Sequence, residues 1–141
     1  PQRLTEITRK AHAVIIPVMP SDIDIHAASR CVADLLLVAK LDRREDRIGV
    51  VANRAKRNTL VYKALTRFLN SLDIPFITSL RDSQNYINAS SEGIGIHEMQ
   101  GSRVKRDLKD WTPLLEWLES RPVTPVQLVH GFRSDATGLR D

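Results

Sequence analysis

The sequence predicts an α/β fold in which a parallel sheet of at least three strands is flanked by helices. Short apolar runs of strand length alternate with longer segments whose apolar residues recur at helical spacing. Each short run ends in polar or turn-forming residues, which favours a buried strand over a buried helix. Strands that alternate with helices pair in parallel through right-handed crossovers. We expect the three strands at residues 13–18, 48–52 and 75–80.

The segments between the strands have the apolar periodicity of amphipathic helices. A short helix should be capped by Asp82 or Ser83 and end at Gly93, a residue type that favours the left-handed cap. In the last long helix, Pro113 either introduces a kink or lies in the first turn of a second helix capped by Thr112. We expect a short helix over residues 3–11, before the first strand, and longer helices over residues 24–40, 59–72 and 104–118. The residues of the last one expected to face inward are Leu108, Trp111, Leu114, Leu115 and Leu118.

Length and composition indicate one globular domain over residues 1–121, with residues 122–141 as a loose tail rich in Pro, Gly, Ser and Thr. Of the 141 residues, 42% are hydrophobic and 27% are charged. The longest apolar runs are far shorter than the roughly 20 residues of a membrane helix, and no secretory leader is visible. The single cysteine, Cys31, has no partner for an internal disulfide. We therefore expect a cytoplasmic protein without a membrane segment.

Three strands form a thin sheet, and at least one of its apolar edges would be unpaired. Because the sequence starts with Pro1, we expect that further strands precede it in a longer protein. The alternative is that a partner or a second copy of the chain covers the open edge.

Four stretches carry a more specific pattern: IIPVMPSDIDIHAA, VVANRA, LRDSQNYINASSEGIGIHEM and VKRDLKDWTPLLEWL. In this order and spacing they resemble the C-terminal half of the ParA-type partition ATPases, which belong to the deviant-Walker class of P-loop NTPases. The resemblance covers about residues 1–121 and implies the C-terminal part of a three-layer P-loop NTPase-like domain. It also implies an ATP-dependent homodimer, non-specific DNA binding, and a role in plasmid or chromosome segregation or in cargo positioning. In that family a partner protein of the partition complex stimulates ATP hydrolysis.

The sequence departs from this family at the phosphate-binding loop. No glycine is followed by lysine, and no Gly-rich run precedes a helix. A P-loop holds phosphates with converging backbone N–H groups and a lysine, so this chain by itself lacks the means to grip a triphosphate. We expect ATP and magnesium to bind in an intact family member, and we expect this chain alone to bind neither and to contain no catalytic residue or metal ligand.

Asn53 ends the second strand, where a carboxamide offers a donor and an acceptor to the N6/N7 edge of adenine. In the resembled family, the asparagine of this Asn53-Arg54 pair lies against the base. A turn-forming asparagine after a strand is the alternative. The resemblance also implies that the loop of Leu80, Arg81 and Asp82 passes over the base and ribose. Alternatively, Arg81 is a surface cation paired with Asp82.

The corner after the first strand matches a Pro-Ser-x-x-Asp pattern of the family through Pro20, Ser21 and Asp24. The resemblance implies that Pro20 and Asp24 border the nucleotide and the dimer face. Helix capping by Ser21 or Asp22 explains part of this corner without a ligand, and capping or an ion pair is the alternative for Asp24. Tyr86 also matches a family position, and we expect it to be a packing residue.

Basic residues gather in two places along the chain. The resemblance implies that the first group binds DNA phosphates non-specifically, with a strong dependence on salt. In the second group, Asp107 and Asp110 dilute the positive charge, and for both groups a solvated helix face is the alternative. The first group is Arg54, Lys56, Arg57, Lys63 and Arg67, and the second is Arg103, Lys105, Arg106 and Lys109.

Two other functions remain open from the sequence. The chain is alternatively a stand-alone α/β interaction or DNA-binding module that does not hydrolyse nucleotides. An unrelated flavodoxin-like or Rossmann-like domain is a third hypothesis, although no dinucleotide-binding Gly fingerprint is present. Zinc chemistry and Cys–His nucleophilic chemistry are not indicated, because the histidines lack ligand spacing and Cys31 lies on the apolar face of a predicted helix.

Overall fold

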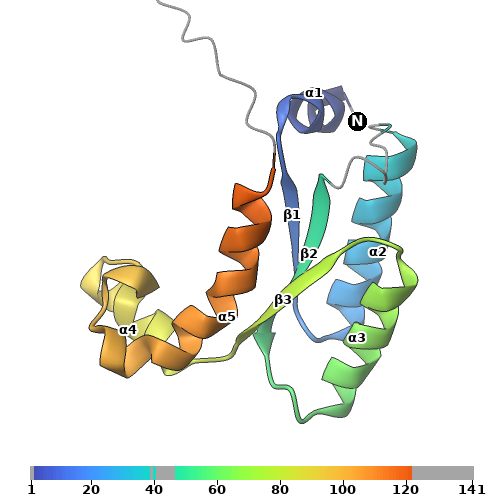
Figure 1. Ribbon diagram of the computed structural model, residues 1–141. Coiled ribbons are helices and arrows are strands. Elements are labelled where there is room, and N and C mark those ends of the chain that lie inside the picture. Colours follow the sequence, from blue (N-terminus) through green and yellow to red (C-terminus); the bar gives the residue numbers. More distant parts are fainter. Residues whose placement is uncertain (1, 39, 41–46, 122–141) are drawn as a thin grey trace, which may run out of the picture.

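The computed structural model describes residues 2–38, 40 and 47–121 and contains a three-stranded parallel sheet (Figure 1). The strands lie side by side in chain order as β1 (Val14–Val18), β2 (Ile48–Ala55) and β3 (Phe76–Arg81). β1 pairs with β2 and β2 pairs with β3, both in parallel. The α/β class and the parallel pairing predicted from the sequence are confirmed, whereas the tail expected over 122–141 lies outside the described residues.

Helices flank the sheet on both faces. α2 (Asp22–Leu37) and α3 (Leu60–Ser71) lie on one face, and α5 (Gly101–Glu119) lies on the other (Figure 1). α1 (Gln2–Lys10) precedes β1, while α4 (Gln84–Glu92) and the short 3₁₀ helix η2 (Ile96–Glu98) connect β3 to α5. Within the described ranges, no helix combines the length and the apolar character that crossing a membrane requires.

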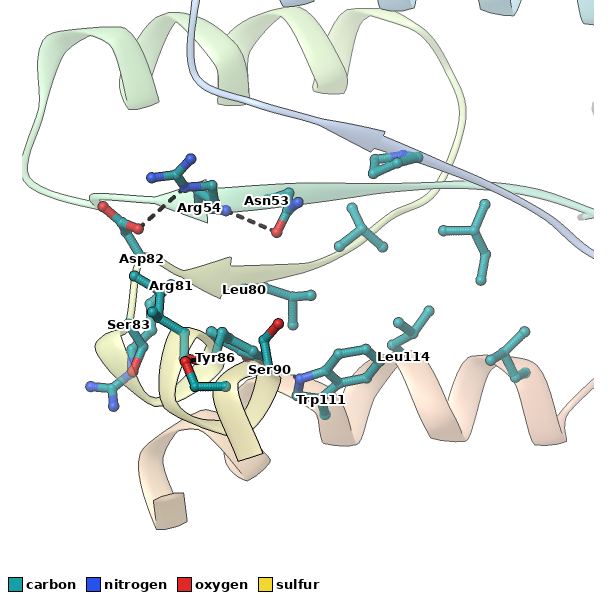
Figure 2. A pocket seen from close by; sticks show the side chains of 16 residues that line it. Asn53, Arg54, Leu80, Arg81, Asp82, Ser83, Tyr86, Ser90, Trp111 and Leu114 are labelled. Atoms are coloured by element: carbon teal, nitrogen blue, oxygen red, sulfur yellow. Dashed lines mark hydrogen bonds and ion pairs between the residues drawn. The ribbon is translucent and has the colours of Figure 1, made fainter. Parts of the chain in front are cut away.

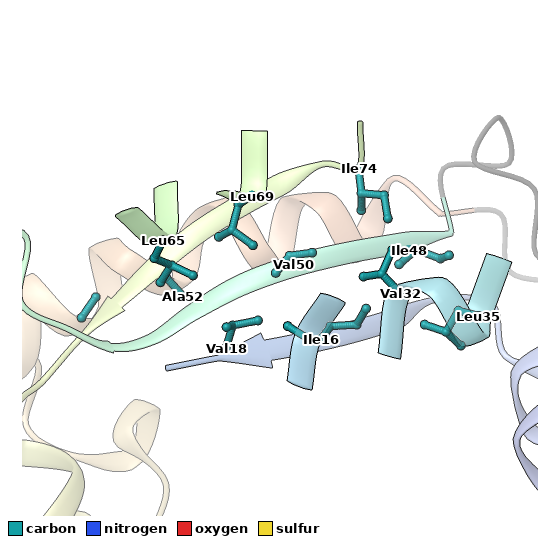
Figure 3. Packing of buried hydrophobic residues seen from close by; sticks show 12 residues of the cluster. Ile16, Val18, Val32, Leu35, Ile48, Val50, Ala52, Leu65, Leu69 and Ile74 are labelled. Atoms are coloured by element: carbon teal, nitrogen blue, oxygen red, sulfur yellow. The ribbon is translucent and has the colours of Figure 1, made fainter. Parts of the chain in front are cut away.

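The main core lies between the sheet and the pair of helices α2 and α3 (Figure 3). Side chains alternate along a strand, so Ile16 and Val18 of β1 are buried in this core while the odd-numbered residues of β1 face the other way. Leu65 and Leu69 of α3, one helical turn apart, are almost fully buried against the same face. Burial of each such aliphatic side chain stabilises the fold by about 1.5–3 kcal/mol.

Side-chain caps set the beginnings of the helices after each strand. Ser21 accepts a hydrogen bond from Asp24 N at the start of α2, and Thr59 accepts one from Tyr62 N at the start of α3. Ser83, rather than Asp82, caps α4 by accepting from Asn85 N at 3.3 Å. Gly93 ends α4 with a φ of 69°, which confirms the predicted left-handed cap.

α5 differs from its prediction in two ways. It begins at Gly101 and runs through Pro113 to Glu119 as one helix, so the alternative of a second helix capped by Thr112 is wrong. Leu115 is 41% exposed, which contradicts its expected inward position. Leu114 is buried as expected, together with Val104 and Asp107, which were not among the residues expected to face inward.

α5 covers β3 and part of β2 but leaves one face of β1 open. Val51, Leu80 and Leu114 form a small core between α5 and the sheet. On the same side of the sheet, Ile15 is 37% exposed and Pro17 is also exposed. β1 is also an edge strand in the described part of the chain, as expected for a thin sheet. The fold therefore presents an apolar strand face beside the carboxyl ends of its strands.

Candidate functional site

A cavity of about 820 Å³ opens on this side of the sheet, where the polar ends of β2 and β3 meet α4 and α5 (Figure 2). Ligands of open parallel sheets bind at the carboxyl ends of the strands, and most small-molecule pockets have volumes of about 300–1,000 Å³. The walls are largely apolar with a few polar groups at one end. The sheet contributes Ile15, Pro17, Val51, Asn53, Arg54 and Leu80, the β3–α4 corner contributes Arg81, Asp82 and Ser83, and the helices contribute Tyr86, Ile87, Ser90, Ser91, Trp111, Leu114 and Leu118.

The structure places five of the predicted site residues at this cavity. Asn53 and Arg54 of β2 lie beside Leu80, Arg81 and Asp82, because Ala52 pairs with Ser79 and Ala55 pairs with Arg81. The expected rim at the strand ends is therefore present as a structural feature.

The other two predicted site residues, Pro20 and Asp24, do not line the cavity. Ser21 Oγ accepts a hydrogen bond from Asp24 N at 3.1 Å and also contacts the Asp24 carboxylate. The capping alternative accounts for Asp24, because its carboxylate completes the first turn of α2.

A bulge in β2 lies beside Asn53, which faces the cavity because strand side chains alternate and Val51, two residues earlier, lies on the same side of the sheet. The β2–β3 register shifts between Ala52 and Ala55, and both alanines are buried in the core against α2 and α3. A regular strand would turn residues three apart to opposite faces, so the bulge restores Ala55 to the core. Arg54 makes this possible by adopting a left-handed conformation, with a φ of 49°.

The bulge also orients the Asn53 carboxamide. Asn53 Oδ1 accepts a hydrogen bond from Arg54 N at 3.0 Å, and its Nδ2 makes no hydrogen bond to another described residue. Asn53 stands on the strand side of the cavity, opposite Tyr86, Ser90 and Trp111 on the helical side (Figure 2). The site therefore presents an amide donor, together with one remaining acceptor lone pair, beside apolar walls.

Asp82 is paired with cations of the β2–α3 corner. Its carboxylate lies 3.4 Å from Arg54 Nε and 3.6 Å from Lys56 Nζ. The alternative that paired Arg81 with Asp82 is therefore wrong. Arg57, the third cation of this corner, lies 3.0 Å from a carboxylate oxygen of Asp110.

Arg81 pairs instead with Asp107, a buried residue whose role the sequence did not reveal. Arg81 Nε donates to Asp107 Oδ1 at 2.6 Å, and Asp107 is 0% exposed. Asn85 Nδ2 and Ser83 Oγ donate to Asp107 Oδ2 at 2.6 Å and 3.3 Å. Burial alone would raise the pKa of Asp107, but the hydrogen bonds from Arg81, Asn85 and Ser83 outweigh it and lower the pKa.

Asp107 was interpreted from the sequence only as an acidic residue that dilutes a basic cluster. Asp107 lies at helical spacing from Val104, Trp111 and Leu114, which places it on the inward side of α5. This spacing is the feature of the sequence that could have indicated its burial. A carboxylate on the buried face of a helix requires charged or hydrogen-bonding partners.

Two aromatic residues form the helical wall of the cavity. Trp111 Nε1 donates to Tyr86 Oη at 3.0 Å, and burial raises the pKa of the Tyr86 hydroxyl. Tyr86 also packs against the small core of Ala89, Ile96, Met99 and Val104. The expected packing role of Tyr86 is present, and the same side chain borders the cavity.

The remaining residues of the first basic group lie elsewhere. Lys63 and Arg67 are exposed on α3, across the sheet from the cavity, and line a separate shallow hollow with Asp22 and Asn70. The structure therefore divides the predicted DNA-binding group into a corner set paired with carboxylates and an α3 set.

Comparison of the chain with protein-family models, with curated proteins and with solved structures finds no match. Within the described residues there is no cluster of three or more His, Cys, Asp or Glu that could hold a metal ion. What the cavity binds must therefore be inferred from its own chemistry. Flat apolar walls, an open amide donor and a nearby acceptor suit a planar heteroaromatic ring that carries both donors and acceptors.

Proposed function

We propose that the cavity binds the adenine base of ATP and that the chain is the C-terminal part of a cytoplasmic ParA-like partition ATPase. The observation that carries this proposal is the Asn53 carboxamide at the cavity, with its Nδ2 donor open and its Oδ1 held by Arg54 N. An asparagine amide can donate to adenine N7 and accept from adenine N6. Leu80, Trp111 and Leu114 supply apolar surface for the faces of the ring.

The residues present fit the base but not the phosphates. In the described part of the cavity the cations Arg54 and Arg81 are each paired with a carboxylate, Asp82 and Asp107. The sequence also lacks the Gly-rich lysine loop that would hold a triphosphate and its magnesium ion. In this proposal that loop belongs to a part of the protein outside this sequence. Asn53 and the Leu80–Asp82 corner orient the base, so that selectivity for adenine comes from this chain.

The same proposal assigns DNA binding to the α3 cations. Lys63 and Arg67 are exposed and make no ion pair to another described residue, whereas the corner cations are partly neutralised by Asp82 and Asp110. Two unpaired cations on one helix face can contact successive phosphates. In a ParA-like homodimer formed with ATP, the two copies of this face would act together, and a partner protein of the partition complex would stimulate hydrolysis.

Binding of adenosine and guanosine, which lack phosphates, tests the base site in this chain. Wild type should bind adenosine in preference to guanosine, and Asn53→Ala should lower that preference about tenfold, the value of one bidentate base contact. Asn70→Ala is the matched control, because Asn70 is an exposed asparagine on α3 that lies away from the cavity. NMR titration measures both affinities. Equal affinity of wild type for the two nucleosides would contradict the proposal.

The open face of β1 favours a second candidate, an interaction module that does not hydrolyse nucleotides. Ile15 and Pro17 expose apolar surface beside an unpaired strand edge. If this surface binds a partner or a second copy, light scattering should show an oligomer that Ile15→Asp converts to a monomer. A wild-type monomer that also shows no salt-sensitive DNA binding would exclude this candidate.

A further inference from the structure

Few other elements of the fold pack against α4, which forms part of the cavity wall. It packs mainly against η2 rather than against a strand, and it stands away from the sheet in Figure 1. Ala89 is its buried contact, within the small core of Ile96, Met99 and Val104. None of these residues belongs to the main core of Figure 3. Apart from this small core and the Tyr86–Trp111 hydrogen bond, the position of α4 relative to β2 depends on the contacts at its first turn.

Those contacts converge on one carboxylate. Asp107 accepts hydrogen bonds from Arg81 at the end of β3, from Ser83 at the cap of α4, and from Asn85 in the first turn of α4. Asn85 Nδ2 also donates to Arg103 O at 3.3 Å, which adds a further hydrogen bond between α4 and α5 to that of Tyr86 with Trp111. Asp107 thus connects three consecutive parts of the cavity rim to α5.

We propose that Asp107 is a positioning residue that fastens the first turn of α4 to the end of β3 and thereby fixes the width of the cavity. The carboxylate is well suited to this role because it accepts several hydrogen bonds at once, and each is strengthened by its charge. Arg81 compensates the buried charge, so its guanidinium is committed to the clamp rather than to a ligand. The consequence for base binding rests on the function proposed above, whereas the clamp itself does not.

Hydrogen exchange of the ligand-free chain tests the clamp directly. Asp107→Asn should accelerate exchange of the backbone amides of α4 about tenfold more than exchange of those of α2 and α3, because local opening of α4 adds to any loss of global stability. Asp110→Asn is the matched control, because Asp110 lies one turn along α5 and its side chain contacts Arg57 and the backbone N of Arg81 but no residue of α4. It should leave α4 protection unchanged. Uniform acceleration in all elements, or unchanged protection of α4, would overturn the proposal.

A second variant covers the case in which Asp107→Asn does not fold. Arg81→Met with Asp107→Leu removes both charges together, which avoids an unpaired buried ion. This double variant should fold and still show fast exchange in α4, because Ser83 and Asn85 have lost their acceptor. Wild-type protection of α4 in the double variant would show that packing alone positions the helix and would overturn the clamp.

Nucleoside binding then separates the two proposals. Asp107→Asn should weaken adenosine binding about tenfold, and Asp110→Asn should change it less than twofold, since loosening of a rim opens the site without removing its donors. If wild type binds no adenosine, the base-site proposal fails while the exchange result still decides the clamp. If α4 loosens and adenosine binding is unchanged, the clamp does not position the ligand.

Discussion

Arg54 holds an unusual backbone conformation for a residue with a side chain, and the site depends on it. Its φ of 49° lies in the left-handed region, which costs a non-glycine residue about 1–2 kcal/mol. In return, the bulge keeps Ala55 in the core, and Arg54 N donates a hydrogen bond to the Asn53 carboxamide at the cavity. Backbone strain of this kind often accompanies functional sites.

Replacement of Arg54 by glycine should show that strain. Arg54→Gly and Arg54→Ala both remove the exposed ion pair with Asp82, which contributes about 0–1 kcal/mol. The glycine variant should be more stable than the alanine variant by about 1 kcal/mol, because only glycine adopts a positive φ without steric cost. Urea unfolding measures the difference. Equal unfolding midpoints with equal slopes would contradict the presence of strain at this position.

The pH dependence of stability should report on Asp107. Its pKa in the folded chain is lowered below the unfolded value of about 3.9, so the hydrogen-bond network stabilises the fold above that pH. That stabilisation is lost as the pH falls through the lowered pKa. The stability difference between wild type and Asp107→Asn should therefore be about 1–3 kcal/mol at neutral pH and shrink below about pH 4. Thermal unfolding between pH 7 and pH 3 checks this, and a difference independent of pH would contradict it.

The two key residues of the site differ in how far the sequence could reveal them. Asn53 was predicted because it follows an apolar strand, and the carboxyl ends of parallel strands meet at one edge of the sheet. Asp107 was missed because its partners Arg81, Ser83 and Asn85 lie more than twenty residues away in sequence. Pairings over such distances leave no local pattern, and only its inward position on α5 distinguished it.

At the scale of elements, periodicity predicted the order and type of the strands and the longer helices, while their ends followed other rules. β2 continues to Ala55 rather than ending at residue 52, because the bulge lets pairing resume after Asn53. The helix predicted over 24–40 begins at Asp22 and ends at Leu37. The Ser21 cap sets the beginning of α2, and α5 continues through Pro113, although a proline removes one hydrogen bond from a helix interior. Thr78 Oγ1 donates to Asp110 O in the turn before this proline, at 2.7 Å.

Gly49 of β2 leaves room for side chains of β3 and α5, Ile77 and Trp117, to pack closely against the backbone of β2. A Cβ at this position would overlap Cδ1 of Ile77 and lie 3.1 Å from Cζ2 of Trp117. Gly49→Ala should therefore destabilise the chain by about 1–3 kcal/mol, the usual cost of overpacking. Chemical denaturation at equilibrium measures this loss.

Ile77→Val is the compensating change, because it removes the Cδ1 atom that the new methyl group would meet. Alone it should cost about 0.5–1.5 kcal/mol, but in the Gly49→Ala background it should cost less or restore stability. Strict additivity of the two losses would show that the methyl group does not meet Ile77.

At the scale of the whole molecule, α5, which lines the cavity, and α3, which carries Lys63 and Arg67, lie on opposite faces of the sheet (Figure 1). The proposed nucleotide site and the proposed DNA-binding surface would therefore not compete for space. This separation was not predicted from the sequence, where Lys63 and Arg67 were placed in one basic group with the corner cations Arg54, Lys56 and Arg57. Ion pairs with Asp82 and Asp110, formed across the fold, divide the two sets.

The proposed DNA-binding surface on α3 can be tested by the salt dependence of DNA binding. Lys63→Ala with Arg67→Ala should weaken binding to fluorescent DNA and lower the slope of log affinity against log salt by about one for each cation removed. Lys105→Ala with Lys109→Ala, which also removes two charges, is the control and should have a smaller effect. Titrations at several salt concentrations measure both slopes. Equal effects of the two pairs would indicate attraction by net charge alone.

The position of the base in the cavity is the most direct test of the central proposal. In a sample saturated with adenosine, nuclear Overhauser effects should connect the adenine H2 and H8 protons to the methyl groups of Leu80 and Leu114, which line the cavity. Contacts of these protons with Leu60 on α3 instead, or the absence of any contact at saturation, would contradict an adenine site at the ends of β2 and β3.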